Sequence, residues 1–385
     1  MRGRKLGAMN LRSVLMVASL IFHAVAFAAE PVKMDVFVAG AGGYRTYRIP
    51  AAVMDAKGNV LAFCEGRRNG KSDAGDIDLL LRRSTDGGVT WGKMQTVWDD
   101  GANTCGNPCP VLDRATGTVW LLMTWNSGAV REAKIKAGFG EDSRRVFVTH
   151  SEDGGATWAA PKEITAAVKR PEWTWYATGP GAGIQLEKGA HAGRLVIPCD
   201  HKAPGENGVR FFSHVIFSDD RGATWQPGGI APRDMVNECE AVELSDGALM
   251  LNMRNYDPKL KARQTAVSDD GGATWRDQRH DAALANPVCQ ASIRRLRWPS
   301  PGKPGVILFS NPASEKNREN LTVRASTDDG KTWPLAARLH GGPGAYSCLC
   351  VFDGAAFGCL YESGDCERIT FARLSFDWLE KAGAR

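Results

Sequence analysis

The sequence predicts an all-β fold, a six-bladed β-propeller, and three observations support this class. An eight-residue motif, Ser-x-Asp-x-Gly-x-Thr-Trp, occurs five times in a chain of 385 residues. Short apolar runs alternate with Gly, Asn, Asp and Pro throughout, and 43 glycines supply the many turns that such a chain requires. Long helical periodicity is missing. Because a unit repeated along a chain is the signature of a repeat architecture, the motif decides the fold class.

Each copy of the motif predicts a structural corner between two strands. Asp accepts hydrogen bonds from backbone N–H groups further along a tight turn, and Gly supplies positive φ. Thr-Trp suits the start of the next strand, with the indole covering the hairpin. The copies occupy residues 84–91, 151–158, 218–225, 268–275 and 326–333. Strand-like runs precede them at residues 77–81, 146–149, 211–217, 265–267 and 321–325. We therefore assign no catalytic role to the motif.

The spacing of the copies predicts the number of blades. Successive copies start 50 to 67 residues apart, which is enough for four strands with their loops, the size of one propeller blade. The mature chain holds about six such units. We expect the sixth blade to be shared between the chain ends, near residues 34–38 and 369–374, so that it closes the ring. A β-sandwich would not explain a corner that recurs at this period.

The first 29 residues predict a secretory signal peptide. Four Lys and Arg residues open the chain, an apolar run follows at residues 14–27, and small residues then offer cleavage sites. The run is too short for a stable membrane span. We expect residues 30–385 to form one propeller domain that is secreted or periplasmic.

Charge and cysteine content limit the partners that the mature chain can have. The full chain carries a net charge of +5, and removing the four basic residues of the leader leaves about +1. A near-neutral protein gives no reason to propose nucleic acid or a membrane as partner, and we expect a monomer. The ten cysteines and seven histidines show no zinc-type spacing, so no metal site is predicted. We expect mostly buried cysteines, with one or two disulfides.

One segment near the start carries a specific resemblance. Tyr47, Arg48, Ile49 and Pro50 are consecutive, and the repeated Asp-containing motif follows them. This combination resembles the sialidase (neuraminidase) family, in its bacterial and animal cellular branch, over nearly all of the mature chain. The resemblance implies a six-bladed propeller that releases terminal sialic acid from sialylated glycans with retention of configuration, and it implies no metal or organic cofactor.

Binding of the substrate carboxylate accounts for the arginines that the resemblance selects. Sialic acid carries a carboxylate on its anomeric carbon, and planar, permanently charged Arg holds such a group better than Lys. The family uses three Arg residues, of which Arg48 matches the first and Arg254 the second. The third is Arg318 or Arg324. Because Arg324 precedes its motif by two residues, as Arg82 precedes the first, it occupies an ordinary strand position, and we favour Arg318.

The same carboxylate makes an anionic nucleophile a poor choice, since like charges repel at close range. A phenol activated by a neighbouring carboxylate avoids this problem, and sialidases use Tyr as nucleophile. Tyr346, which follows Gly-Gly-Pro-Gly-Ala, matches that position. Its partner is Glu238 or Glu240, and the spacing to Arg254 favours Glu238.

The remaining assignments also follow the resemblance. Asp73 lies in a Gly-rich loop after Arg67, where a mobile carboxyl can act as acid and then as base. Asp76 and Asp78 are competitors, but they lead into the next strand. Arg67 resembles the family's extra Arg that contacts a ring hydroxyl. Glu362 resembles the carboxylate that orients the first Arg, with a solvated charge at a strand end as the alternative.

The sequence therefore predicts an exo-α-sialidase acting on glycoproteins, glycolipids and oligosaccharides. A trans-sialidase or intramolecular trans-sialidase shares the same groups, and a non-catalytic glycan-binding propeller shares the motif. Retention of Tyr346, Glu238 and Asp73 together favours the enzyme. Two aromatic segments either line the rest of the pocket or pack between blades: Trp125-Asn126 and Trp173-Thr174-Trp175-Tyr176.

Overall fold

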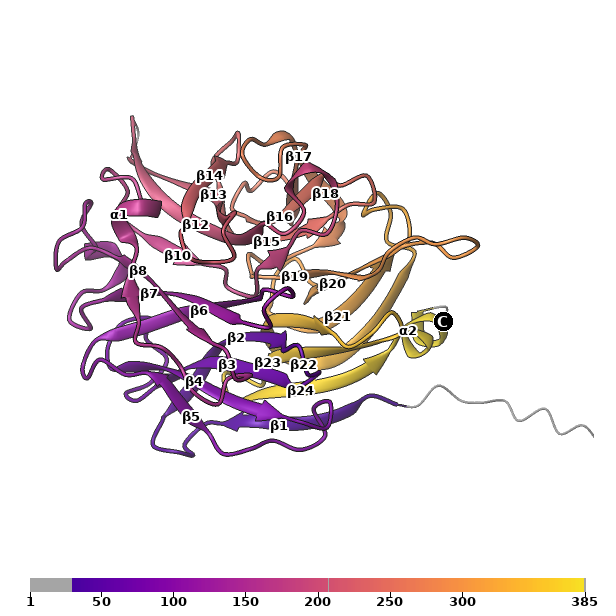
Figure 1. Cartoon of the computed structure of the whole chain (residues 1–385), viewed down its shortest axis with the longest axis horizontal. Coiled ribbons are helices and arrows are strands. Elements are labelled where there is room, and N and C mark those ends of the chain that lie inside the picture. Colours follow the sequence, from indigo (N-terminus) through magenta and orange to yellow (C-terminus); the bar gives the residue numbers. More distant parts are fainter. Residues whose placement is uncertain (1–29, 207, 384–385) are drawn as a thin grey trace, which may run out of the picture.

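The computed structural model describes residues 30–206 and 208–383, and these residues form an all-β protein (Figure 1). The described helices are short: α1 (Thr165–Val168), α2 (Phe376–Gly383) and the 3-10 turns η1 (Glu132–Lys134) and η2 (Gly189–His191). Over these same residues, none of the helices has the length and apolar character needed to span a membrane. The predicted signal peptide lies outside the described residues. The all-β prediction is confirmed.

The first sheet contains two antiparallel groups of four strands. The groups are β2–β5 and β6–β9, and a single parallel pair between Ile77 and Thr104 joins them. Its strands are β2 (Thr46–Met54), β3 (Val60–Arg67), β4 (Ile77–Ser84), β5 (Gln95–Trp98), β6 (Thr104–Leu112), β7 (Val119–Asn126), β8 (Arg145–Ser151) and β9 (Lys162–Glu163). Each group has the strand number that a propeller blade requires.

Two smaller sheets follow along the chain. The second is ordered β10-β12-β13-β14 with β11 paired to β12, and the third is ordered β15-β16-β17-β18. Their strands are β10 (Tyr176–Thr178), β11 (Ile184–Gln185), β12 (Leu195–Gly205), β13 (Gly208–Ser218), β14 (Gln226–Ile230), β15 (Val236–Glu243), β16 (Leu249–Asn255), β17 (Ala262–Ser268) and β18 (Arg276–Ala285). Both sheets are antiparallel throughout.

The last sheet unites the two ends of the chain. Its strands are β19 (Ser292–Arg297), β20 (Val306–Pro312), β21 (Glu319–Ser326), β22 (Leu335–Val351), β23 (Ala356–Ser363), β24 (Arg368–Ser375) and β1 (Val32–Val38). The long strand β22 pairs with β21 through its first half and with β23 through its second half. Met34 of β1 lies opposite Phe371 of β24. The predicted pairing of the chain ends is confirmed.

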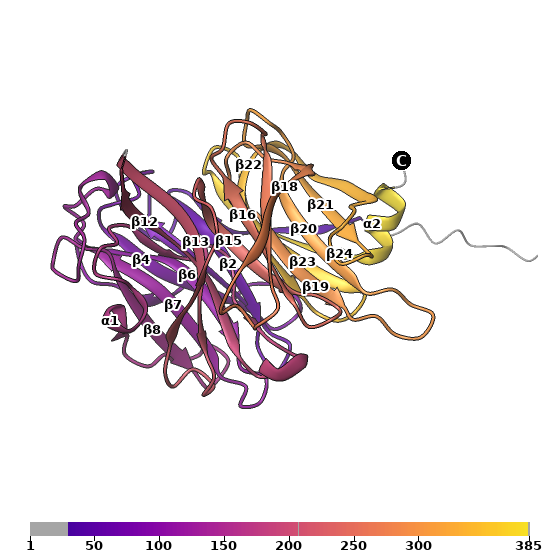
Figure 2. The same cartoon turned by 90° about the horizontal axis from the view of Figure 1, so that it is seen from above.

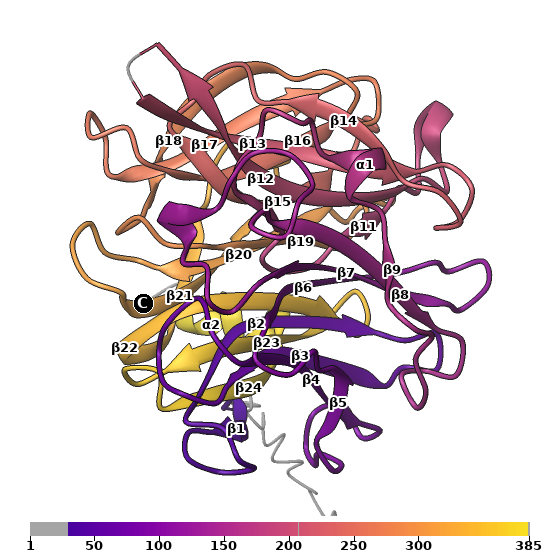
Figure 3. The ribbon, with the colours of Figure 1, turned by 90° about the vertical axis from the view of Figure 1, so that its left-hand side faces the viewer.

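The first strands of successive groups contact one another around a common centre. β2 contacts β6 and β22, β6 contacts β10 and β11, β15 contacts β19, and β19 contacts β22. Figure 2 shows β2 and β15 between the purple strands of the first sheet and the yellow strands of the last. In Figure 3 the sheets lie one above another, from β1 and β24 at the bottom to β13 and β17 at the top. The arrangement is propeller-like, with these inner strands next to the axis.

The repeated motif forms the same turn each time. Ser268 ends β17, and its hydroxyl donates to Asp270 at 2.8 Å and accepts from the N–H of Gly272. Asp270 in turn accepts from the N–H of Thr274 at 2.9 Å and from its hydroxyl at 2.6 Å. The other four copies repeat these bonds. The predicted strand-to-strand corners are confirmed.

The expectation of disulfides is wrong. All ten cysteines lie among the described residues, all are free thiols, and nine are buried. Cys105 and Cys109, a close pair in the sequence, pack into two different hydrophobic clusters, one with Leu61 and the other with Leu122. A chain of this length buries a sufficient core without covalent links, so these side chains serve as small apolar groups.

Candidate active site

A cavity of about 190 Å³ gathers seven of the eight predicted site residues. They are Arg48, Arg67, Asp73, Glu238, Arg254, Arg318 and Tyr346. Glu362, the eighth, lies behind Arg48 and is 1% exposed. Residues separated by up to about 300 positions thus meet at one place, because the inner strands that carry many of them surround a common centre.

Breaks in strand pairing turn several of these side chains into the cavity. The register of β2 shifts after Arg48, where Ile49 adopts a φ of 60°. The register of β6 shifts around Asn107, that of β15 around Glu238, and that of β22 around Tyr346. A bulge re-aims a side chain away from the regular alternation, and a positive φ is rare for a β-branched residue such as Ile. The breaks in strand pairing therefore lie in those parts of the inner strands that line the cavity.

Arg48 is held in place by Glu362. The guanidinium donates from Nε at 2.8 Å and from Nη2 at 3.3 Å to the two carboxylate oxygens. The same carboxylate accepts from the backbone N–H groups of Ile49 and Tyr346. Burial acts to raise the pKa of Glu362, but the ion pair and these hydrogen bonds hold it below its usual value. The alternative of a solvated strand-end charge is therefore excluded.

Arg254 and Arg318 also lie close to the phenol ring of Tyr346. Arg254 Nη1 donates to Tyr346 Oη at 3.1 Å. The Arg318 guanidinium lies 5.6 Å from the ring centroid, and that of Arg48 lies 5.2 Å from it. Arg324 lies outside the cavity and donates to Asn311 at 2.8 Å. Of the two candidates for a third carboxylate-binding arginine, Arg318 lines this cavity and Arg324 does not.

Tyr346 and Glu238 form a short hydrogen bond. The phenol Oη donates to Glu238 Oε1 at 2.5 Å, and Glu238 Oε2 accepts from Arg254 at 2.6 Å. Burial, and then the charge of Glu238, raise the pKa of Tyr346 well above its usual value, although Arg254 and Arg48 act to lower it. Glu240 points elsewhere: its oxygens accept from Ser292 and from the N–H groups of residues 182 and 293. Glu238 is therefore the carboxylate that contacts the phenol.

Asp73 lies at the mouth of the same cavity. Its carboxylate pairs with Arg67 at 2.7 Å, and 61% of its side chain is exposed. Partial desolvation acts to raise the pKa of Asp73, but the charges of Arg67 and Arg48 outweigh this and hold the pKa below its usual value. Asp76 and Asp78 pair with Arg68 instead and do not line the cavity. Of the three candidates, Asp73 alone reaches the site.

The far wall of the cavity contains a buried arginine that the sequence did not reveal. Arg144 is 2% exposed, and it donates to the side-chain oxygens of Asn107 and Asn126 and to the carbonyl of Tyr176. Its guanidinium lies 4.5 Å from the ring of Trp175. Burial lowers the pKa of Arg144 to about 10. No pattern in the sequence distinguishes Arg144 from the arginine that follows it.

Asp200 completes that wall. It is 1% exposed, Trp175 Nε1 donates to its Oδ1 at 3.1 Å, and its Oδ2 has no hydrogen-bond partner. Burial raises the pKa of Asp200 well above its usual value, and the charges of Glu238 and Glu132 add to this effect. One feature of the sequence could have indicated Asp200, because this charged residue directly follows the apolar residues 195–199 of β12. Trp175 lines the cavity, whereas Trp173 packs in the core.

Residues suited to a metal do not gather in the described part of the chain, which holds no group of three or more His, Cys, Asp or Glu side chains that could bind an ion. The cavity instead collects guanidinium groups around a phenol and a carboxylate. Such a cluster recognises an anion through charge-assisted, bidentate hydrogen bonds.

Comparisons with known proteins identify the family of this chain. Residues 58–359 match the BNR repeat-like domain. A sialidase of Micromonospora viridifaciens is 36% identical over 367 residues, which cover 91% of this chain and 55% of that protein. An exo-alpha-sialidase of Aspergillus fumigatus is 31% identical over 365 residues, which cover 87% of this chain and 82% of that protein. The chain belongs to the sialidase family.

A solved structure extends the likeness to three dimensions. The Hadza microbial sialidase Hz136 superposes with a TM-score of 0.82 at 32% identity, covering 90% of this chain and 69% of that one. Sialidase family membership thus rests on sequence and on fold. The chain spans just over half of the length of the Micromonospora relative.

Proposed function

We propose that this member of the sialidase family hydrolyses terminal α-linked sialic acid from glycoconjugates with retention of configuration. One observation carries the proposal. The phenol of Tyr346 donates to Glu238 at 2.5 Å inside a cluster formed by Arg48, Arg254 and Arg318. A nucleophile with its base, placed within a binding site for an anion, is the constellation that an acidic sugar with a carboxylate on its anomeric carbon requires.

Binding begins with the substrate carboxylate. Arg48, Arg254 and Arg318 receive it, and the ion pair with Glu362 keeps the Arg48 guanidinium in one orientation before the substrate arrives. Such preorganisation lowers the entropic cost of binding. Arg67, held by Glu65 at 2.6 Å, is placed to contact a ring hydroxyl near the mouth of the cavity.

The first chemical step uses Tyr346 and Asp73. As Tyr346 Oη bonds to the anomeric carbon, its proton passes to Glu238, and the bond to the leaving oxygen breaks. Asp73 donates a proton to that oxygen, so the aglycone departs as a neutral alcohol. Because Arg48 is among the charges that lower the pKa of Asp73, a substrate carboxylate on Arg48 raises that pKa and favours the acid form.

The second step returns the enzyme to its starting state. Asp73, now ionised, takes a proton from water, and the water oxygen bonds to the anomeric carbon while the bond to Tyr346 breaks. The phenol recovers its proton from Glu238. Two displacements at one carbon retain the configuration, and free sialic acid leaves.

The architecture and location form part of the same proposal. Residues 30–385 form one domain of six blades, with the last blade shared between β1 and β22–β24. Residues 1–29 act as a signal peptide for a secreted or periplasmic, monomeric protein. Support for the architecture comes from the groups of four strands and from the pairing of the chain ends, whereas the signal peptide and the location rest on the sequence pattern of residues 1–29.

Hydrolysis of a fluorogenic α-sialoside by the purified chain tests the proposal. We expect release of fluorophore by the wild type and a loss of most turnover in Tyr346→Phe, which keeps the three arginines and still binds sialic acid. Analysis of the products with lactose present separates the rivals. Free sialic acid alone supports hydrolysis, whereas sialyl-lactose or an anhydro-sugar identifies a transferase. Binding without turnover in the wild type identifies a glycan-binding propeller.

A further inference from the structure

A second cavity, of about 410 Å³, lies at the opposite ends of the inner strands. Arg48 near the start of β2 lines the first cavity, and Met54 at the end of β2 lines the second. In the same way Tyr346 of β22 belongs to the first cavity and Cys350 to the second. The two cavities share no residue. The second cavity is therefore a separate feature of the molecule.

Arg294 of β19 reaches this second cavity with almost no partners. The residue is 9% exposed, both terminal nitrogens are buried, and neither makes a hydrogen bond. Its Nε donates to the carbonyl of Leu349 at 3.4 Å. The carboxylate paired with it is Glu240, at 3.9 Å from Nη2, and that carboxylate already accepts three other hydrogen bonds. A buried charge with so little compensation is costly and calls for an explanation.

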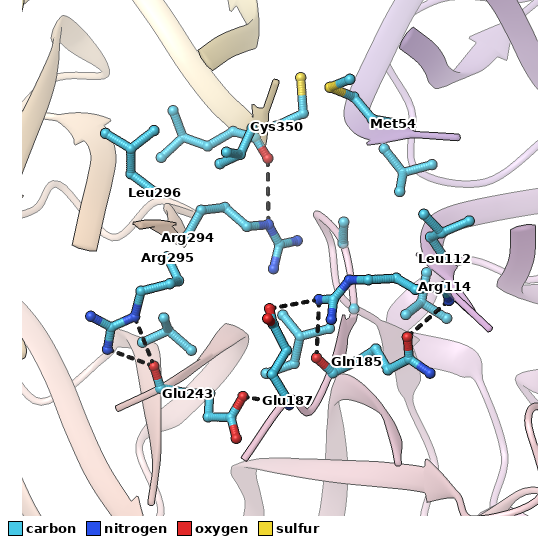
Figure 4. Close-up of a pocket in the computed structure, with 18 of the residues that line it drawn as sticks. Met54, Leu112, Arg114, Gln185, Glu187, Glu243, Arg294, Arg295, Leu296 and Cys350 are labelled. Carbon is cyan, nitrogen blue, oxygen red and sulfur yellow. Dashed lines mark hydrogen bonds and ion pairs between the residues drawn. The ribbon is translucent and has the colours of Figure 1, made fainter. Parts of the chain in front are cut away.

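A second guanidinium faces the same part of the cavity. Figure 4 shows Arg114 and Arg294 pointing toward one another from opposite sides. Arg114 pairs with Glu187 at 3.0 Å and donates to the carbonyl of Gln185. The other carboxylates that line the cavity, those of Glu243 and Asp353, each accept from two backbone N–H groups and form no ion pair with Arg294. Arg114 thus has a close anionic partner in Glu187, whereas the terminal nitrogens of Arg294 have only Glu240, at 3.9 Å.

We propose that this second cavity binds an oxyanion, a carboxylate or a phosphate, carried on a small organic ligand, with Arg294 as the principal partner and Arg114 as the second. An oxyanion gives the two terminal nitrogens of Arg294 the charge-assisted hydrogen bonds that they lack. Met54, Leu112 and Leu296 offer apolar surface to the organic part. The volume of the cavity falls within the range of small-molecule sites.

Binding requires a local movement that the structure allows. The terminal nitrogens of Arg294 are buried, so a ligand reaches them only when a neighbouring side chain moves outward. Arg114 lines the same cavity and can move, because about half of its side chain is exposed and its ion pair with Glu187 is at the surface.

Thermal unfolding in the presence of anions tests the proposal. Phosphate and glucuronate are the probes, with chloride at the same ionic strength as the reference. All variants carry Arg318→Gln, which weakens anion binding around Tyr346 and so reduces the contribution of the first cavity to the response. In this background we expect both probes to raise the unfolding midpoint in a saturable way. Adding Arg294→Gln abolishes the response, and adding Arg114→Gln weakens the apparent affinity at least tenfold.

Arg324→Gln is the matched control, because Arg324 is a partly buried arginine that lines neither cavity. It leaves the anion response unchanged. A response to phosphate alone identifies a free-phosphate site, and a stronger response to glucuronate identifies an organic anion. An equal response with and without Arg294 overturns the proposal. If Arg294→Gln does not fold, the variant Arg114→Gln tests the proposal instead, because the Arg114 side chain is half-exposed. An unchanged anion affinity in Arg114→Gln also overturns the proposal.

Discussion

The motif turns and the inner-strand site satisfy their polar groups in opposite ways. In the turn at residues 268–275, the polar side chains Ser268, Asp270 and Thr274 bond to one another and to the backbone of the same eight residues. In the site, Arg48 finds Glu362 at a separation of 314 residues, and Tyr346 finds Glu238 at a separation of 108. A motif turn is complete by itself, whereas the site exists only in the assembled fold.

Because of this difference, we expect substitutions in a motif turn to change the stability of the protein and substitutions in the site to change its activity. A change in a motif turn removes local hydrogen bonds and leaves the axis intact, so its cost falls on folding. A change in the site removes a group that faces the cavity, so its cost falls on binding or turnover. The comparison fails if a turn residue controls catalysis, or if the site residues act mainly on stability.

Glu238→Gln carries the largest expected effect. The amide cannot take the proton of Tyr346, so we expect kcat to fall by about 100- to 10,000-fold, the usual contribution of a general base. The unfolding midpoint also falls, because the neutral Gln leaves the buried guanidinium of Arg254 without its charged partner. Measurement of kcat and thermal unfolding on the same preparation checks both points.

Glu240→Gln is its control two residues away. Glu240 is buried and accepts three hydrogen bonds without touching Tyr346. We expect lower stability and an unchanged kcat per folded molecule. Equal losses of kcat in the two variants would mean that the carboxylate contacting the phenol has no special role.

Arg318→Ala is the next largest change. Loss of a charged hydrogen bond of about 1.5–3 kcal/mol lowers kcat/KM by about 10- to 150-fold. Arg324→Ala, which removes an arginine of β21 that lies outside the cavity, leaves kcat/KM nearly unchanged. Initial-rate kinetics on one sialoside compare the two, and the reverse order would show that the third arginine is misassigned.

Glu362→Gln tests a site residue that supports the fold through its ion pair with Arg48. The pKa of Glu362 is lower in the folded chain than in the unfolded chain, so the folded state binds fewer protons. Its stabilising contribution is present above the unfolded value of about 4.3 and is lost as the pH falls below it. At neutral pH we expect a loss of roughly 3 kcal/mol, since Arg48 keeps a buried charge without its partner.

Chemical denaturation of both proteins between pH 7 and pH 3 measures this effect. The stability of the wild type falls more steeply toward acid, and the two curves converge. Parallel curves over the whole range would show that the ion pair with Arg48 does not set the pKa of Glu362.

Asp270→Ala has the smallest expected effect. It removes the acceptor of three hydrogen bonds within one turn. We expect a loss of about 1 kcal/mol, which lowers the unfolding midpoint by about 2 °C. Turnover per folded molecule stays unchanged, and a fall in kcat would break the separation between turn and site.

The same contrast explains what the sequence could predict. The motif turns repeat, so the all-β class and the corners were readable from one chain, and Arg318 was separated from Arg324 because it lies outside the repeat. The register breaks that aim Arg48 and Tyr346 into the cavity arise from long-range packing and leave no local pattern. Arg144 was missed for the same reason, since nothing near it in the chain distinguishes a buried arginine from an exposed one.

Covalent trapping tests the central claim most directly. A 2,3-difluorinated sialic acid carries a good leaving group at the anomeric carbon, and its second fluorine slows breakdown of the sugar–enzyme bond. Peptide mass spectrometry after incubation locates the adduct. We expect a stoichiometric adduct on Tyr346 in the wild type and none in Tyr346→Phe. An adduct on Asp73 or Glu238, or turnover of the fluorosugar with Tyr346 unmodified, would contradict the account.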